Sequence, residues 1–248
     1  MSERFYLSEP VRNGRAFLAG DEAKHLIKVM RAKIGDEILL FNGTGTEYVA
    51  RIEAVQKDHV QLEILSSVFP ETEPKTEITI AVSLPKGDRQ KLMLEKLTEI
   101  GCKRVIPLKT ERGIVSCDEK VCERLRRQVV EASKQSRRST LMEVLPEMSL
   151  EQVAAWAEDG CHCYIAHPVV DGDFGQQPLS SLLDAGSKKD KFLILIGPVG
   201  GLTAEEVQRA IDLGFRPIDL GPRILKVETA AMIIAACLIY GCREYHVS

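Results

Sequence analysis

"FLILIGPVGGLTAEEV", residues 192–207, joins an apolar run to the start of a helix through a glycine-rich turn. The continuous apolar run at 192–196 is typical of a strand buried on both faces of a parallel sheet. Thr203 and Glu206 have the spacing of a capping box, which predicts that a helix begins just after the turn. The stretch therefore predicts a strand–loop–helix unit of an α/β fold. Its loop lies at the carboxyl end of the strand, where such folds bind ligands.

The glycines of this loop match neither of two common phosphate-binding motifs. A P-loop requires Gly-Lys-Ser/Thr, and a dinucleotide fingerprint opens the first strand–helix unit of a domain rather than a late one. Taken alone, the loop could also be a tight turn with no ligand. A second stretch, "LGPRILKVETAA" at 220–231, again has Gly-Pro after a predicted strand. Two such loops at adjacent strand ends predict a pocket walled largely by backbone groups, which suits a flat neutral heterocycle better than a triphosphate.

The chain divides into two parts with different hydrophobic patterns. Residues 1–70 carry short runs with alternating apolar residues, which predict a small antiparallel β domain interrupted by one amphipathic helix at 21–33. Residues 71–77 are polar, contain proline and are predicted to be a linker. Residues 78–248 alternate apolar strand patterns with helix patterns, which predicts a largely parallel sheet with helices on both faces.

Composition excludes several classes of protein. With 44% hydrophobic and 28% charged residues, the chain is too apolar for a disordered protein. No apolar run is long enough to cross a membrane, and the N-terminus lacks the apolar stretch of a signal peptide, so we expect a cytoplasmic location. The "CHC" at 161–163 lacks a second Cys/His pair at metal-site spacing, so no metal is predicted. Reduced thiols are expected at positions 102, 117, 122, 161, 163, 237 and 242.

Charge is distributed unevenly along the chain. The net charge is −3, yet residues 122–138 contain six cations against Glu123 and Glu131. The cations are Arg124, Arg126, Arg127, Lys134, Arg137 and Arg138. A local basic stripe on an acidic protein is compatible with a docked polyanion, and a solvated helix face is the alternative.

Five segments of the second part resemble one enzyme family in the same order. They are "LPKGDRQKLMLEKLTEIG", "KTERG", "EASKQSRR", "IGPVGGLTAEE" and "LGPRILKVETAA". "HLIKVMRAKIGDEILLFNG" resembles the PUA-like N-terminal segment of the same family. By this resemblance, which covers nearly the whole chain, the sequence is identified as a member of the ribosomal RNA small subunit methyltransferase E family. These are 16S rRNA uridine N3-methyltransferases of the SPOUT superfamily.

The resemblance implies a fold and a cofactor. It implies a PUA-like β-barrel domain, followed by a SPOUT-type parallel sheet whose C-terminal chain forms a trefoil knot. Knots are rare among proteins in general, so this expectation comes from the resemblance alone. The family likeness further implies S-adenosylmethionine (SAM) as cofactor, a homodimer joined through the knot region, and 16S rRNA or the small ribosomal subunit as partner.

For a SAM-dependent RNA methyltransferase, roles are expected for particular residues. Arg223 is expected to lie by the target base or its phosphate and to stabilise developing negative charge, with a structural ion pair as the alternative. Glu228 is expected to act as a base or as an anchor for the helix N-terminus. The cofactor pocket is expected to contain Ile196, Gly197, Pro198, Gly200, Gly201, Leu220, Gly221, Ile224 and Leu225. Contacts to RNA phosphates are expected from His25, Lys28, Arg31, Lys86, Arg89, Arg112, Arg137 and Arg138.

The sequence departs from the family pattern in the pocket loops. Val199 stands where the family commonly has Glu, and Lys226-Val227 where it commonly has Arg-Thr. Val199 removes a carboxylate, and Lys226 keeps the charge but loses the bidentate fork of arginine. A non-catalytic RNA-binding or ribosome-assembly factor that retains the fold is therefore the alternative function. A nicotinamide-dependent oxidoreductase is disfavoured because the fingerprint is missing.

Overall fold

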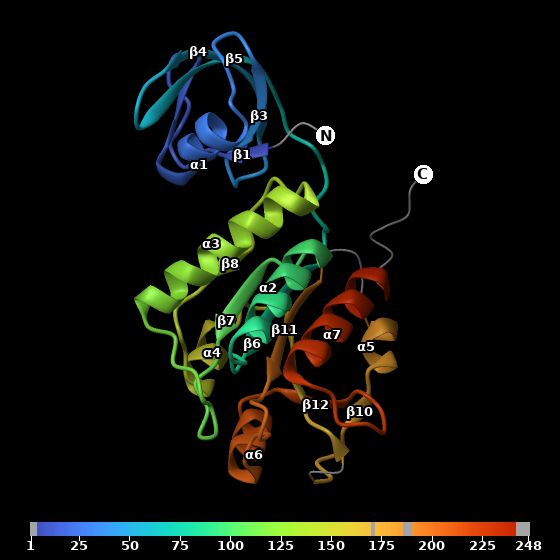
Figure 1. Ribbon diagram of the computed structural model, residues 1–248. Helices are drawn as coiled ribbons and strands as arrows, with labels where there is room; N and C mark the ends of the chain where they lie inside the picture. The colour runs from blue at the N-terminus through green and yellow to red at the C-terminus, as the bar shows by residue number, and fades with distance from the viewer. Residues whose placement is uncertain (1–3, 170–171, 186–189, 242–248) are drawn as a thin grey trace. The chain divides into compact units, whose positions relative to one another are not determined.

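The computed structural model describes residues 4–169, 172–185 and 190–241 (Figure 1). The chain forms two compact units, one of residues 1–73 with 130–141 and the other of residues 74–129 with 142–248. The sequence pattern did not predict that residues 130–141 belong to the first unit. Cys242, named above among the thiols, lies outside the described residues.

The first unit is a curled five-stranded sheet with one short helical segment (Figure 1). The strands lie in the order β1-β3-β4-β5-β2. Its elements are β1 (Arg4–Tyr6), β2 (Arg15–Ala19), α1 (Gly20–Lys24), the π-helix η1 (His25–Val29), β3 (Glu37–Phe41), β4 (Glu47–Val55) and β5 (His59–Val68). Alternate residues of these strands point inward, as period-two patterning requires. Phe5, Leu18, Leu40, Ile52 and Leu62 form part of the resulting core.

Two expectations for this unit need correction. The sheet is not wholly antiparallel, because β1 pairs with β3 in parallel. The helix expected at 21–33 ends early: η1 stops at Val29, and Arg31 has a φ of 53°. A left-handed backbone cannot continue a right-handed helix, so the apolar spacing of the segment overestimated its length.

The second unit is an α/β layer built on a seven-stranded parallel sheet. The strand order is β10-β12-β9-β11-β6-β7-β8. Its strands are β6 (Glu77–Val82), β7 (Arg104–Pro107), β8 (Glu143–Val144), β9 (Cys161–Ala166), β10 (Gln177–Pro178), β11 (Lys191–Ile196) and β12 (Arg216–Asp219). Its helices are α2 (Asp88–Ile100), α3 (Glu119–Ser136, whose last turns belong to the first unit), α4 (Leu150–Trp156), α5 (Ser180–Ala185), α6 (Ala204–Asp212) and α7 (Val227–Gly241).

Helices cover both faces of this sheet, as the apolar strands predicted (Figure 1). Leu193 and Leu195 of β11 pack with Val153 of α4 and Val207 of α6 on one face. Side chains alternate along a strand, so Ile194 faces the other side. There α7 contacts β6 and β11 and packs against α2. The sheet is therefore buried on both faces.

Two helix ends of the second unit follow local sequence signals. The predicted capping box of α6 is present: Thr203 Oγ1 accepts from the Glu206 amide (3.2 Å), and Glu206 Oε2 accepts from the Thr203 amide (2.9 Å). Gly101 closes α2 in the left-handed conformation, with φ 101°. Helix α2 begins without a side-chain cap: its N-cap is Gly87, and Asp88 is already helical.

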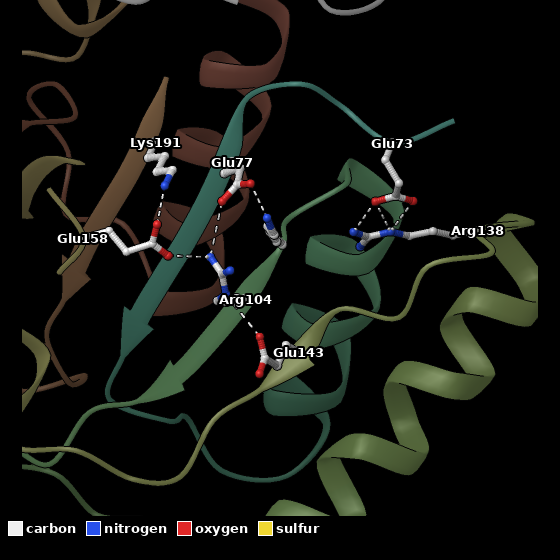
Figure 2. A network of polar contacts seen from close by, with 8 residues as sticks. Glu73, Glu77, Arg104, Arg138, Glu143, Glu158 and Lys191 are labelled. Carbon is white, nitrogen blue, oxygen red and sulfur yellow. Dashed lines mark hydrogen bonds and ion pairs between the residues drawn. The ribbon is translucent and has the colours of Figure 1, made fainter. Parts of the chain in front are cut away.

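Charged side chains form a network at the amino ends of the central strands of the second unit (Figure 2). Arg104 lies within ion-pair distance of Glu77 (3.4 Å), Glu143 (3.1 Å) and Glu158 (3.8 Å). Lys191 hydrogen-bonds to Glu158 and holds the pKa of that carboxyl below its ordinary value. The charged side chains at the amino ends of these strands are therefore paired with one another.

A buried ion pair ties residues 130–141 to the rest of the first unit (Figure 2). Arg138 is 7% exposed and binds Glu73 with two nitrogens: Nε lies 3.0 Å from Oε1, and Nη2 lies 2.7 Å from Oε2. Removing one member of a buried pair leaves a buried charge without its counter-ion.

We expect Glu73→Gln to lower the free energy of unfolding by about 2 kcal/mol, less than for a fully buried pair because the carboxylate is partly exposed. Urea unfolding followed by circular dichroism measures this change. Glu71→Gln, at an exposed position of the same segment, is the matched control and should change stability little. Equal stability of the two variants would contradict a structural role for the pair.

No helix within the described ranges combines the length and the apolar character that a membrane span requires.

Candidate cofactor-binding site

A pocket of about 210 Å³ lies at the carboxyl ends of β9, β11 and β12 in the second unit. Most of its wall comes from the last residue of β11 and the loop that follows it, and from the last residue of β12 and the loop that follows it. The end of β9 (Ala166) with His167 and Pro168 after it, Arg89 of α2 and Ala230 of α7 complete it. The two Gly-Pro loops thus share one pocket, as the sequence predicted.

The strand order corrects one detail of that prediction. The loops do not follow adjacent strands, because β9 lies between β11 and β12. The end of β9 therefore contributes the middle of the pocket wall. His167 lies there, 4% exposed, with its ring edge-to-face against Phe174 at 5.3 Å between centroids.

The loop after β11 is a tight turn held by close packing. The Gly201 amide donates to the carbonyl oxygen of Pro198 (2.9 Å), which closes the turn. A Cβ on Gly197 would lie 2.7 Å from Cγ of Leu202, closer than such atoms approach. Position 197 therefore requires glycine, because the Leu202 side chain occupies the space that a Cβ would need.

The loop after β12 turns on Gly221. This residue has a φ of 104°, and its amide donates to Oδ2 of Asp219 (3.0 Å). A Cβ built on Gly221 would meet no heavy atom within 4 Å, so it would project into open space. Because Gly221 lines the pocket, its lack of a side chain keeps room for a ligand beside the backbone.

Eight of the nine residues predicted to bind a cofactor line the pocket. They are Ile196, Gly197, Pro198, Gly201, Leu220, Gly221, Ile224 and Leu225. Gly200 is the exception, and its carbonyl oxygen instead accepts a hydrogen bond from Nη1 of Arg112 (2.9 Å). The lining is mainly apolar side chains and backbone, which fits the adenosine part of a nucleoside cofactor.

The two predicted catalytic residues differ in their surroundings. Arg223 is exposed and lines the pocket. Glu228 is 4% exposed, lies in the first turn of α7 and is not part of the pocket lining. Its Oε2 has no hydrogen-bond partner among the residues that the structure describes. Arg223 can thus reach a bound molecule, whereas Glu228 lies inside the protein.

Sequence reasoning missed part of the wall. Ala166, His167, Pro168, Leu202, Asp219 and Ala230 were not predicted, although all line the pocket. The proline that ends the run "YIAHP" marks a strand end and was an available signal. The departures Val199, Lys226 and Val227 also line the pocket, and Val199 is 58% exposed.

The predicted RNA-contacting cations have different environments. In the first unit, Lys28, Arg31 and Arg137 are exposed, His25 is half-buried, and Arg138 is buried against Glu73. In the second unit, Lys86 and Arg112 are exposed, whereas Arg89 lines the pocket. Several cations of the basic stripe are paired with carboxylates, for instance Lys134 with Glu22 (2.8 Å).

No group of three or more His, Cys, Asp or Glu side chains suited to a metal ion occurs in the described part of the chain.

Sequence and structure comparisons agree on the relatives of this chain. The RNA methyltransferase domain family matches residues 72–239, and the RNA methyltransferase PUA domain family matches residues 18–65. The ribosomal RNA small subunit methyltransferase E of Bacillus subtilis is 30% identical over 227 residues, covering 90% of this chain and 89% of that protein.

Two solved structures have the same fold over nearly their full length. A methyltransferase from Legionella pneumophila in complex with SAM has a TM-score of 0.85 and 28% identity, covering 96% of this chain and 97% of the other. The ribosomal RNA small subunit methyltransferase E of Neisseria gonorrhoeae bound to SAM has a TM-score of 0.81 and 30% identity, with the same coverage. The match over residues 72–239 and the relatives at 30% identity show that the chain belongs to the ribosomal RNA small subunit methyltransferase E family of RNA methyltransferases.

Proposed function

We propose that the chain transfers a methyl group from SAM to N3 of a uridine in 16S rRNA of the small ribosomal subunit. The observation that carries this proposal is the single pocket formed by the two Gly-Pro loops, lined by eight of the nine predicted cofactor residues. Two relatives of the same fold, at 28% and 30% identity, are bound to SAM. A substrate of this kind would confine the activity to the cytoplasm.

The pocket residues suit the parts of SAM. Ile196, Leu220 and Leu225 offer apolar contact to the adenine ring, and the backbone of Gly221 is open to the ligand. When bound, SAM supplies an electrophilic methyl group on its sulfonium. The protein's task is to orient the donor and the RNA base and to exclude water.

Arg223 is the residue that we assign to charge stabilisation. Uridine N3 holds a proton at neutral pH, so negative charge develops on the uracil oxygens as that proton leaves. A guanidinium at the pocket wall stabilises such charge. For Glu228 we propose the role of anchor rather than base, because a carboxylate in the first turn of α7 interacts favourably with the helix dipole.

The RNA has to present an unpaired uridine. N3 lies on the pairing edge of the base, so the nucleotide is unstacked or flipped outward before it enters the pocket. Exposed cations on each unit, Lys28, Arg31 and Arg137 on the first and Lys86 on the second, suit contacts to phosphates. Arg138 is left out of this set because it is buried against Glu73.

We also propose that the chain forms a homodimer through α7. This helix is apolar on all sides, and Met232, Ile233, Ala236 and Tyr240 form a partly exposed stripe at helical spacing. Tyr240 is 70% exposed and Ile233 is 36% exposed. Stripes of this kind on soluble proteins commonly mark subunit interfaces. The trefoil knot stays a prediction of the family resemblance.

The test is methyl transfer from labelled SAM to small subunits isolated from cells that lack this chain. We expect label in 16S rRNA and N3-methyluridine in the nucleoside digest, measured by mass spectrometry. A variant with a blocked pocket, Gly221→Leu, is the matched control and should transfer no label.

Label on another base or position would contradict the N3 assignment. Binding of both SAM and subunits without transfer would favour the alternative, a non-catalytic assembly factor. The assembly-factor alternative is tested because Val199 stands at the pocket wall where the family commonly has a carboxylate.

A further inference from the structure

We call residues 197–201, the turn after β11, the cofactor loop; a second loop contacts it from outside the pocket. We call residues 109–113, which follow β7, the clamp loop. Nη1 of Arg112 donates to the carbonyl oxygen of Gly200 (2.9 Å). The aliphatic part of the same side chain lies against Gly200, with Cδ 3.7 Å from the position that a Cβ would take. Both the guanidinium and the aliphatic carbons of Arg112 therefore contact the turn at Gly200.

Glu206, in the first turn of α6 shortly after the cofactor loop, links the clamp loop to the start of that helix. Its Oε1 accepts from the backbone amide of Glu111 (2.8 Å), while its Oε2 accepts from the amide of Thr203 (2.9 Å). One carboxylate thus caps α6 and holds the clamp loop. A capping box needs only one of these two oxygens, as the Ser149–Gln152 box of α4 illustrates. The second oxygen of Glu206 is therefore available for the link.

The base of the clamp loop is fixed to the sheet. Thr110 Oγ1 donates to Oγ of Ser83 (3.2 Å), and the amide of Ser83 donates to the carbonyl oxygen of Ile196 (3.0 Å). Gly113 packs tightly here, since a Cβ on it would lie 2.9 Å from Thr110 Oγ1. The clamp loop is thus anchored at its base and binds the cofactor loop at its tip.

We propose that Arg112 is a positioning residue for the cofactor loop and not a contact for RNA phosphate. It acts through Gly200: because the Gly200 carbonyl is bound outside the pocket, the neighbouring Val199 and Gly201 are held in the wall. Fixing a loop in its binding conformation lowers the entropic cost of binding. This inference rests on the proposed function, in which residues 197–201 contact SAM.

Calorimetry with SAM tests the proposal on the full-length chain. We expect Arg112→Ala to weaken SAM binding about tenfold, the effect of losing one hydrogen bond from a charged donor. The turnover number at saturating SAM should stay within about twofold, because Arg112 touches no reacting atom. Arg112→Lys retains a donor without the fork and should restore part of the affinity.

The matched control is Lys109→Ala. It removes the same charge from the same exposed loop, and among the described residues no hydrogen bond or ion pair joins the Lys109 side chain to the cofactor loop. We expect its SAM affinity to equal that of the wild type. RNA affinity against salt concentration should have the same slope in wild type and Arg112→Ala, whereas a lost phosphate contact would reduce the slope by about one.

Glu206→Gln tests the second link. Glutamine has one acceptor oxygen, so it can keep the cap on α6 but not the bond to Glu111 at the same time. We expect Glu206→Gln to lose less SAM affinity than Arg112→Ala. In the double variant the loss of affinity should differ from the sum of the two single losses, because both residues bind the clamp loop to its neighbours.

Amide hydrogen exchange without SAM separates this inference from the proposed function. We expect faster exchange at residues 198–206 in Arg112→Ala and Glu206→Gln, and wild-type exchange there in Lys109→Ala. Unchanged exchange and unchanged SAM affinity in Arg112→Ala would overturn the clamp. Failure of the wild type to bind SAM would instead overturn the proposed function, while the exchange comparison would still decide the clamp.

Discussion

Gly221→Leu is expected to abolish SAM binding, with a loss of affinity of about 100-fold or more because the side chain would fill the space beside the loop. Gly221 lines the pocket, and a Cβ there projects into open space rather than into the protein. The added side chain therefore competes with the ligand and not with the core. Isothermal titration calorimetry measures the loss.

Gly214→Leu separates blockage from backbone strain. Gly214 has a φ of 93° against 104° for Gly221, and a Cβ on it also meets nothing within 4 Å. Both variants carry the strain of a left-handed leucine, about 1–2 kcal/mol. Gly214 lies outside the pocket lining. Equal SAM affinity in the two variants would contradict the position of the ligand beside Gly221.

Arg223→Ala is expected to lower the rate of methyl transfer by about 100- to 1,000-fold, the usual effect of removing one group that stabilises developing charge. The expectation follows from the exposed position of Arg223 on the pocket wall. Single-turnover measurements at saturating SAM and subunits report this step without product release. Arg223→Lys keeps the positive charge but lacks the bidentate fork of arginine, so its transfer rate should lie between those of the wild type and Arg223→Ala.

The matched control is Arg209→Ala on α6. Arg209 is exposed and pairs with Glu151 (3.1 Å), so its loss should change stability and rate little. A wild-type transfer rate in Arg223→Ala, with only weaker SAM binding, would show that Arg223 holds the cofactor and does not stabilise the reacting base.

The sequence predicted the two pocket loops because their signals are local. Glycine and proline after apolar strands define turns wherever they occur, and the Thr203–Glu206 box sets the start of α6 within four residues. Gly197 and Gly221 could therefore be assigned to the pocket without knowledge of the sheet order. The early end of η1 at Val29 was missed because apolar spacing continues beyond it.

The remaining features depend on contacts between distant parts of the chain. The place of β9 between β11 and β12, which brings His167 into the pocket, follows from the order of strands in the sheet. Arg112 and Gly200 are 88 residues apart, and Glu73 and Arg138 are 65 apart. In the sequence these two arginines, the glutamate and the glycine all look like solvent-facing residues, and only the folded chain distinguishes them.

The most direct measurement is a crystal structure of the chain grown with SAM. We expect the donor to lie between residues 197–201 and 220–225, with its adenine against the apolar wall and its methyl group toward the side of Arg223. Density for the donor at another site, or the two loops separated from each other, would contradict a shared cofactor pocket.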